Sequence, residues 1–145
     1  MPLCNLAWNY DENFFWDGRV FSLEHQALEP VTNPIEMHNT WNVVIQRLQD
    51  HPEYPNMFTD AFGDGAITKE KATKAIAQFE RTLISANSKF DNYLLGQTQL
   101  TPQELNGLNV FMDETKGDCF HCHGNPNNPL WTDNIFHNKI QKLYS

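Results

Sequence analysis

The chain has 145 residues, 40% of them hydrophobic, which is enough for one ordinary domain or for parts of two small ones. Its 10 basic and 18 acidic residues give a formal net charge of -8, which argues against nucleic acid or an anionic membrane surface as a partner. No run approaches the roughly 20 apolar residues of a membrane-spanning helix, so no membrane span is predicted, and the first residues carry no recognisable export signal.

The first sixty residues are rich in Asn, Pro and aromatic side chains without a clean period. This composition predicts short helices joined by ordered loops. One helix is predicted from about Thr40 to Gln49, because four apolar residues there fall on one face; they are Trp41, Val44, Ile45 and Leu48. Pro52 and Pro55 are expected to end this helix.

Two further helices are predicted in the second half of the chain. The first begins near Thr68 and continues to about Ser85, with an apolar stripe formed by Ala72, Ile76, Phe79 and Leu83. The second begins after Thr101, where Pro102 suits the first helical position and Glu104 completes a capping box. Its expected buried face consists of Leu105, Leu108 and Met112.

No segment shows sustained period-two alternation, so the predicted fold class is mostly α. The polar, glycine-containing stretch between Ser88 and Leu100 is the best place for a boundary between two packed units. We therefore expect one unit over residues 1–97 and a second over 98–145.

The segment Cys119-Phe120-His121-Cys122-His123 matches the C-x-x-C-H pattern of c-type haem attachment. One helical turn presents two thiols to the two vinyl groups of haem, and the adjacent imidazole then lies under the iron. Cys119 and Cys122 are therefore candidate thioether ligands, and His123 is the candidate axial ligand of the iron.

Other interpretations of the two thiols stay open. Zinc could use them with a histidine, although only Cys4, His137 or distant histidines could complete its ligand set. A thioredoxin-like motif would follow a strand, and none is predicted before Cys119. A sixth haem ligand inside the chain would have to come from Met37, Met57, Met112 or His137, and no spacing singles one out. Cys4 is the odd thiol and is interpreted as a small hydrophobic residue.

Several motifs in a fixed order resemble bacterial di-haem cytochrome c peroxidases and MauG-like proteins, over nearly the whole chain. The likeness begins with residues 14–19 (Phe-Phe-Trp-Asp-Gly-Arg), Leu23, Gln26, Pro30, residues 33–34 (Asn-Pro) and residues 36–37 (Glu-Met). It continues through residues 51–55, 61–64, 75–82 and 88–91, the haem motif, and residues 132–134 (Thr-Asp-Asn).

The resemblance implies cytochrome c-like helical haem domains in a two-domain di-haem architecture. It assigns Cys119, Cys122 and His123 to the second, electron-transfer haem, and residues 1–97 to the later part of the first, peroxidatic domain. Glu36 matches a distal-pocket glutamate that moves a proton during peroxide cleavage. Gln26 and Pro30 match residues of the same pocket, and Trp16 matches a tryptophan between the two haems.

The sequence departs from the family pattern in two places. The first C-x-x-C-H is absent, and so is the distant sixth ligand of the second haem, so we expect an internal fragment with one haem c site, which need not be filled, and no peroxidase activity of its own. A second haem and a calcium ion are expected in the parent, the longer protein of which this chain would be a fragment. The calcium ligands are expected outside this region.

The implied function of the parent is reduction of hydrogen peroxide in the periplasm, with electrons from a small donor protein such as a cytochrome c or a cupredoxin. A homodimer is compatible with the family. Three alternatives stay open: a MauG-like enzyme of the methylamine utilisation type that oxidises a protein substrate, a mono-haem electron-transfer module, and a haem-free chain whose cysteines are free, paired or metal-bound.

Overall fold

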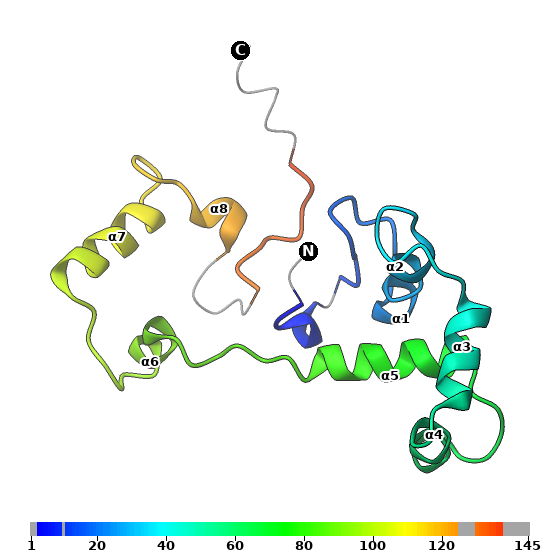
Figure 1. The fold of residues 1–145 in the computed structure, drawn as a ribbon. Helices are drawn as coiled ribbons and strands as arrows, with labels where there is room; N and C mark the ends of the chain where they lie inside the picture. Colours follow the sequence, from blue (N-terminus) through cyan, green and yellow to red (C-terminus); the bar gives the residue numbers. More distant parts are fainter. Residues whose placement is uncertain (1–2, 10, 125–129, 138–145) are drawn as a thin grey trace. The chain divides into compact units, whose positions relative to one another are not determined.

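The computed structural model describes residues 3–9, 11–124 and 130–137, and these form helices joined by loops (Figure 1). Their only strand-like pairing is a single bridge between Phe14 and Val20, so the predicted mostly α class is confirmed. The elements in chain order are the 3-10 helix η1 (Leu6–Trp8) and the α-helices α1 (Leu23–Gln26), α2 (Glu29–Thr32), α3 (Trp41–Asp50), α4 (Tyr54–Phe62), α5 (Lys69–Arg81), α6 (Lys89–Leu94), α7 (Pro102–Met112) and α8 (Phe120–His123).

The chain divides into two compact units. Unit 1 comprises residues 1–3 and 12–83, and unit 2 comprises residues 4–11 and 84–145. Unit 1 therefore contains α1 to α5, and unit 2 contains η1 and α6 to α8. The residues around η1 belong to unit 2 because Asn5 pairs with Ser85 through its side chain, at 3.1 Å to the Ser85 carbonyl and 2.8 Å from the Ser85 N–H.

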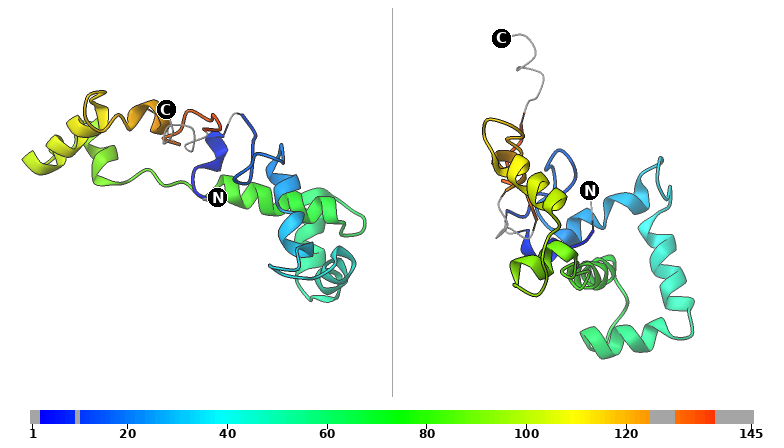
Figure 2. Two further views of the ribbon diagram at one scale, coloured as in Figure 1. Left: turned by 90° about the horizontal axis from the view of Figure 1, so that it is seen from above. Right: turned by 90° about the vertical axis from the view of Figure 1, so that its left-hand side faces the viewer.

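The core of unit 1 forms where α1 packs against α5 (Figure 2). Leu23 and Ala27 are buried on the α1 side, and Ala77 of α5 is completely buried. The predicted apolar stripe of α5 is confirmed at Ala72, which is buried, and Leu83 is half-buried, but the prediction is wrong at Ile76 and Phe79, which are 40% and 64% exposed. The small Ala77 side chain lets α1 approach closely, so the face that carries Ala77 is the buried one.

A carboxylate lies at the edge of this interface. Glu80 is 7% exposed, and its Oε2 has no hydrogen-bond partner. Burial raises the pKa of Glu80, and the nearby Glu24 carboxylate adds to the increase while Arg81 opposes it. Arg81 itself pairs with Glu24 of α1, so two acids and one base lie between the two helices.

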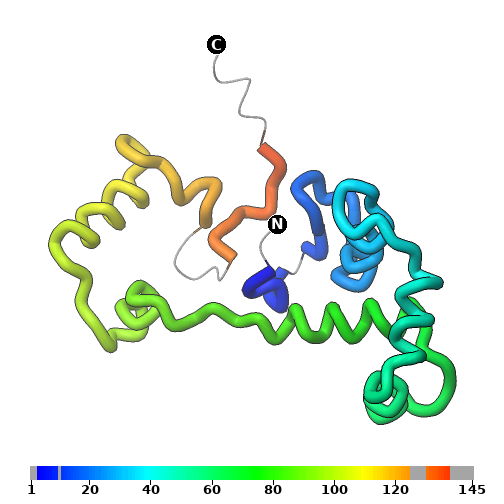
Figure 3. The backbone as a smooth tube through the Cα atoms, in the orientation of Figure 1, coloured from blue at the N-terminus to red at the C-terminus, as the bar shows by residue number. Residues whose placement is uncertain are grey.

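The third and fourth helices meet at a short connection over residues 51–53 (Figure 3). The prediction of α3 is confirmed, with the Thr40 hydroxyl accepting from the Val43 N–H at its start and the four predicted apolar residues half-buried. No sequence pattern predicted α4. Pro55 does not stop a helix there; it occupies the first turn of α4, where its missing N–H costs no hydrogen bond.

Two capped helices begin the main part of unit 2. Ser88 and Asp91 form a capping box at the start of α6, and Thr101 and Glu104 form the predicted one at the start of α7. Lys89 joins the two helix starts through a 2.5 Å ion pair with Glu104. That lysine, first among several donors, lowers the pKa of Glu104 to about 2.

No helix within the described parts of the chain is both long enough and apolar enough to cross a membrane.

Candidate haem-attachment site

The C-x-x-C-H residues are Cys119, the N-cap of α8, and the four residues of α8 itself, which form a single helical turn. The Cys119 carbonyl accepts hydrogen bonds from the N–H groups of Cys122, at 3.3 Å, and His123, at 2.9 Å. Both thiols are half-buried and free of disulfide bonds, and the His123 imidazole is exposed. The turn therefore holds two thiols and the exposed imidazole of His123 within five residues.

The loop before the turn fixes where it starts. The Gly117 N–H donates to the Val110 carbonyl at 3.0 Å, and the Cys119 N–H donates to the Phe111 carbonyl at 3.2 Å. A methyl group on Gly117 would lie 2.4 Å from the Val110 oxygen, so a side chain at 117 requires the backbone to move. The Cys119 thiol points back into this loop and donates to the Gly117 carbonyl at 3.3 Å.

His121, the second variable residue of the motif, also contacts this loop. Its ring lies between two carboxylates, with Nδ1 bonded to Asp118 and Nε2 at 3.7 Å from Glu114. Both ring nitrogens of His121 therefore face carboxylates, whereas no such partner is found for His123 among the described ion pairs.

The segment 130–137 returns to the other side of the turn. The Asp133 N–H donates to the Cys122 carbonyl at 3.1 Å, and the Asp133 carboxylate contacts His137 Nε2 at 2.7 Å. The hydrogen bond from the Ile135 N–H, followed by His137, lowers the pKa of Asp133, so this carboxyl is ionised at neutral pH.

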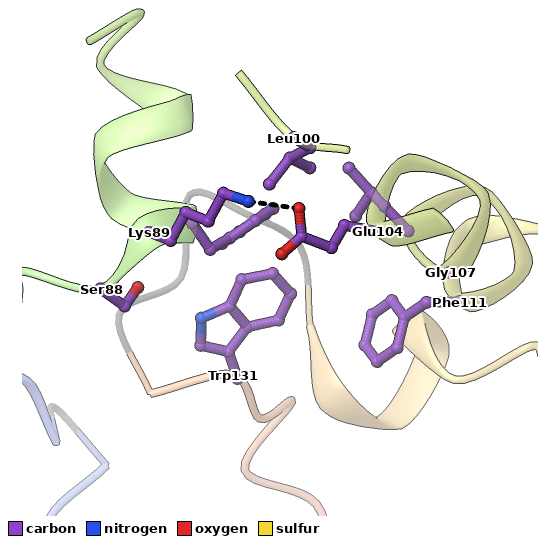
Figure 4. Close-up of a pocket in the computed structure, with 9 residues that line it drawn as sticks. Ser88, Lys89, Leu100, Glu104, Gly107, Phe111 and Trp131 are labelled. Carbon is purple, nitrogen blue, oxygen red and sulfur yellow. Dashed lines mark hydrogen bonds and ion pairs between the residues drawn. The ribbon is translucent and has the colours of Figure 1, made fainter. Parts of the chain in front are cut away.

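An apolar cavity of about 500 Å³ lies beside the turn (Figure 4). Trp131 forms part of its wall, with ring centroids 5.4 Å from Phe90 and 5.8 Å from Phe111. Figure 4 shows the Lys89–Glu104 ion pair above the Trp131 ring. Phe111 also accepts the hydrogen bond from Cys119, so the cavity wall and the motif share backbone contacts.

These residues fit a covalently attached haem. Two free thiols one turn apart, an accessible imidazole and neighbouring aromatic side chains are the groups that such a cofactor needs. The thioredoxin-like interpretation is wrong, because α7 and a loop precede Cys119 in place of a strand. A zinc site built on both thiols gains no support, because Cys119 faces the Gly117 carbonyl while the Cys122 sulfur lies near Asp133 and His137.

The predicted distal residues lie in unit 1, on α1, on α2 and in the turn after α2. Gln26 ends α1 and Pro30 is the second residue of α2, and both are half-buried. Glu36 is exposed in the turn, and the N–H of Met37 beside it donates to the Pro30 carbonyl at 3.1 Å. The structure thus connects the Glu36 turn to Pro30. The catalytic roles of the three residues stay predictions.

Asn33 organises the turn that carries Glu36. Its carbonyl accepts from the N–H groups of Glu36, at 3.1 Å, and His38, at 3.0 Å, while its side-chain oxygen accepts from Ile35. This role of Asn33 was not predicted from the sequence. Asn followed by Pro is a turn signal that could have predicted this role.

Trp16 lies at the tip of the loop closed by the Phe14–Val20 bridge. Its side chain is 83% exposed, whereas Phe14 is buried. Left-handed backbone at Phe15 and Gly18 makes the loop tight, and the Arg19 guanidinium covers the Phe15 ring at 3.8 Å. The loop therefore presents an indole ring on the surface of unit 1, where its predicted electron-transfer role stays untested.

A helical scaffold that carries a C-x-x-C-H turn defines the class of c-type haem proteins. Within this class, the sequence profile of the di-haem cytochrome c peroxidase family matches residues 1–99. The chain belongs to that family, as the resemblance predicted. The family binds haem c, and the haem motif of this chain lies beyond the matched residues.

Individual relatives extend the match. The chain is 38% identical over 136 residues to the methylamine utilization protein MauG of Methylophilus methylotrophus, covering 92% of this chain and 38% of that protein. It is 41% identical over 114 residues to the cytochrome c551 peroxidase of Nitrosomonas europaea, covering 77% and 33%. A solved MauG-like protein associated with microbial copper homeostasis superposes with a TM-score of 0.78 at 27% identity, covering 94% of this chain and 41% of that one. The chain thus spans well under half the length of these relatives.

Proposed function

We propose that this chain is part of a di-haem c-type oxidoreductase that reduces hydrogen peroxide with electrons from a small redox protein. The supporting observation is the α8 turn, which holds the thiols of Cys119 and Cys122 and the exposed imidazole of His123 together. Relatives named as cytochrome c peroxidases support the same activity. Bound haem would supply one-electron iron chemistry at this turn.

The two predicted domains have different proposed roles. Residues 98–145 begin the electron-transfer haem domain, in which Cys119 and Cys122 anchor the porphyrin and His123 binds the iron. Residues 1–97 form the later part of the peroxidatic domain, whose haem is supplied by chain outside this sequence. The parent protein is periplasmic in this proposal, with calcium bound elsewhere and a cytochrome c or a cupredoxin as electron donor.

In unit 1, Glu36 is the proposed proton carrier for the bound peroxide. Its carboxylate is exposed, so it can take a proton from one peroxide oxygen and return it to the other. Gln26 and Pro30 line the same pocket in this proposal. Exposed Trp16 would pass electrons between the two haems.

A MauG-like enzyme that oxidises a protein substrate is the second candidate. Relatives with that name match as closely as the peroxidases do, at 38% identity. The two candidate functions differ in the second substrate that is oxidised when hydrogen peroxide is consumed. A peroxidase consumes peroxide while it oxidises a reduced donor protein, whereas the MauG-like enzyme couples peroxide to oxidation of its protein substrate.

Haem attachment is tested by maturing the parent protein in a cell that exports it and attaches haem. We expect an intact mass that includes haem and an alkaline pyridine spectrum of the c type. Cys119→Ser and Cys122→Ser should each leave a single thioether, which shifts the pyridine band. A colourless parent protein with both thiols unmodified would contradict the proposal.

The role of Glu36 is tested in the same haem-loaded parent. Glu36→Gln should lower kcat/KM for peroxide by about 10²–10⁴-fold, the range for loss of a general acid or base. Glu53→Gln, at another exposed acid of unit 1, serves as the matched control. Equal kcat/KM values for the two variants would remove Glu36 from the mechanism.

A further inference from the structure

The Cys122 thiol has two metal-binding neighbours besides its proposed haem partner. Its sulfur, a carboxylate oxygen of Asp133 and a ring nitrogen of His137 all lie within 4.8 Å of one another. Cys122 and Asp133 are half-buried, and His137 is more exposed. One sulfur, one oxygen and one nitrogen therefore converge at one point on unit 2.

Backbone and side-chain bonds hold the three groups in place. The Asp133 N–H donates to the Cys122 carbonyl at 3.1 Å, which joins the segment 130–137 to α8. Asp133 Oδ1 accepts from the Ile135 N–H at 3.0 Å, and Oδ2 contacts His137 Nε2 at 2.7 Å. The carboxylate is thus fixed on one side and faces the imidazole on the other.

The second thiol of the motif is not part of this cluster. Cys119 points toward the Gly117 carbonyl, at 3.3 Å, on the side of the turn that faces the preceding loop. The two thiols therefore have different surroundings, although they are three residues apart. Only Cys122 is placed to share an ion with Asp133 and His137.

The ligand set and the spacing suit zinc. Thiolate, imidazole and carboxylate bind Zn²⁺ at about 2.3, 2.0–2.1 and 2.0–2.2 Å, so around a tetrahedral ion the ligand atoms lie roughly 3.3–3.7 Å apart. A separation of no more than 4.8 Å is brought into that range by small side-chain rotations. The ion would replace the proton between Asp133 and His137, and water would fill the fourth position.

We propose that Cys122, Asp133 and His137 bind a divalent cation of the Zn²⁺ type in the chain before haem is attached. This inference rests on the three side chains and not on the proposed peroxidase function. Haem attachment would end metal binding at this cluster. The Cys122 thiol then adds across a vinyl double bond, forming a carbon–sulfur bond while its hydrogen goes to the other vinyl carbon, and the resulting thioether has no thiolate charge to offer a metal. Zinc and covalent haem are thus alternative occupants of Cys122.

The test uses the 145-residue chain made without haem, reduced, and with Cys4→Ser to remove the exposed third thiol. Co²⁺ is the spectroscopic probe, and Zn²⁺ affinity is measured by competition with a coloured chelator. We expect one Co²⁺ per chain, visible bands of a four-coordinate ion and a sulfur-to-cobalt band with the intensity of one thiolate. Added Zn²⁺ should abolish these bands.

Single substitutions distinguish this site from the two-thiol zinc site. Cys122→Ser, Asp133→Asn and His137→Asn should each weaken Zn²⁺ binding by more than about 100-fold, beyond the usual effect of outer-shell changes. Cys119→Ser should keep the affinity, and so should His38→Asn, which alters an exposed histidine in unit 1. Far-ultraviolet circular dichroism checks that every variant keeps its helices.

Two results would overturn the proposal. If Cys119→Ser weakens binding as much as Cys122→Ser, the ion is held by both thiols. If the Asp133→Asn and His137→Asn variants bind Zn²⁺ as tightly as the chain without these substitutions, the cluster holds no ion. Alkylation gives an independent readout, because Zn²⁺ should protect Cys122 more than Cys119 from iodoacetamide. Neither result depends on peroxidase activity.

Discussion

Arg81 of α5 donates hydrogen bonds to the Glu24 carboxylate of α1 from both terminal nitrogens, at 2.9 Å from Nη1 to Oε1 and 3.4 Å from Nη2 to Oε2. The pair joins residues 57 positions apart, at the packed interface of unit 1. Removing Arg81 would leave Glu24 unpaired next to a second, buried carboxylate.

Arg81→Gln should therefore lower the free energy of unfolding by about 1–2 kcal/mol, above the range for exposed pairs because this one is partly buried. Urea denaturation at neutral pH measures the change. Arg19→Gln is the control, since Arg19 and its partners Asp17 and Glu29 are more exposed. An equal loss in both variants would show that burial adds nothing to the Arg81 pair.

The contribution of Glu80 to the stability of unit 1 should depend on pH in the opposite direction to that of an ordinary ion-paired carboxylate. Burial raises its folded-state pKa, so the folded chain favours the protonated form; this contribution is complete below the unfolded pKa and is lost as the pH rises through the folded pKa. Glu80→Gln should stabilise unit 1 at pH 7, and the gain should disappear near pH 4.

The control for Glu80 is Glu70 on the same helix. Hydrogen bonds from its own backbone N–H and from Thr68 lower the Glu70 pKa, so Glu70→Gln should lose stability at pH 7, and the loss should fade as the pH falls through its folded pKa. Urea titrations at several pH values measure both variants. A Glu80→Gln variant that is less stable at pH 7 would refute the raised pKa.

Lys89 is expected to control the ionisation of Glu104. Because the Lys89 ammonium is the first of the groups that lower the Glu104 pKa to about 2, Lys89→Met should raise that pKa toward its ordinary value. A carboxylate with a lowered pKa stabilises the fold only while it is ionised. As the pH falls, the variant should therefore lose the capping contribution of Glu104 at a higher pH than the chain that keeps Lys89. Carbon NMR of the Glu104 carboxyl measures the shift, and Lys69→Met should leave it unchanged.

Trp131 is expected to stabilise the cavity wall in unit 2. Trp131→Ala removes ring contacts with Phe90 and Phe111, and aromatic pairs contribute about 0.5–1.5 kcal/mol each, so a loss of about 1–3 kcal/mol is expected in urea denaturation. Phe136→Ala, at a 62% exposed ring in the same segment, should cost no more than about 0.5 kcal/mol. Similar losses for both would mean that the Trp131 contacts add no stability.

Local signals in the sequence were sufficient for several elements. The apolar face over residues 41–48, the cap at Thr101 and the C-x-x-C-H spacing act within a few residues, so α3, α7 and the α8 turn could be predicted. The prediction at Pro55 failed because proline is common both after the end of a helix and in its first turn. The residue alone does not distinguish the two positions, and here it lies in the first turn of α4.

Long-range packing could not be predicted in the same way. The buried face of α5 depends on α1, more than 40 residues earlier, and α1 selects Ala77 over the more hydrophobic Phe79. Asp133 and His137 lie in the non-helical segment 130–137, so no helical periodicity in the sequence could place them beside Cys122.

Gly117 has a consequence for how this turn can evolve. Only a hydrogen atom fits against the Val110 oxygen, and the constraint comes from the polypeptide itself, before any cofactor arrives. Exchange of this glycine would shift the anchor of the Cys119 sulfur even in a chain that never receives haem. Tolerance at position 117 is thus limited by backbone sterics, and a screen for folding alone would detect that limit without any assay for colour or electron transfer.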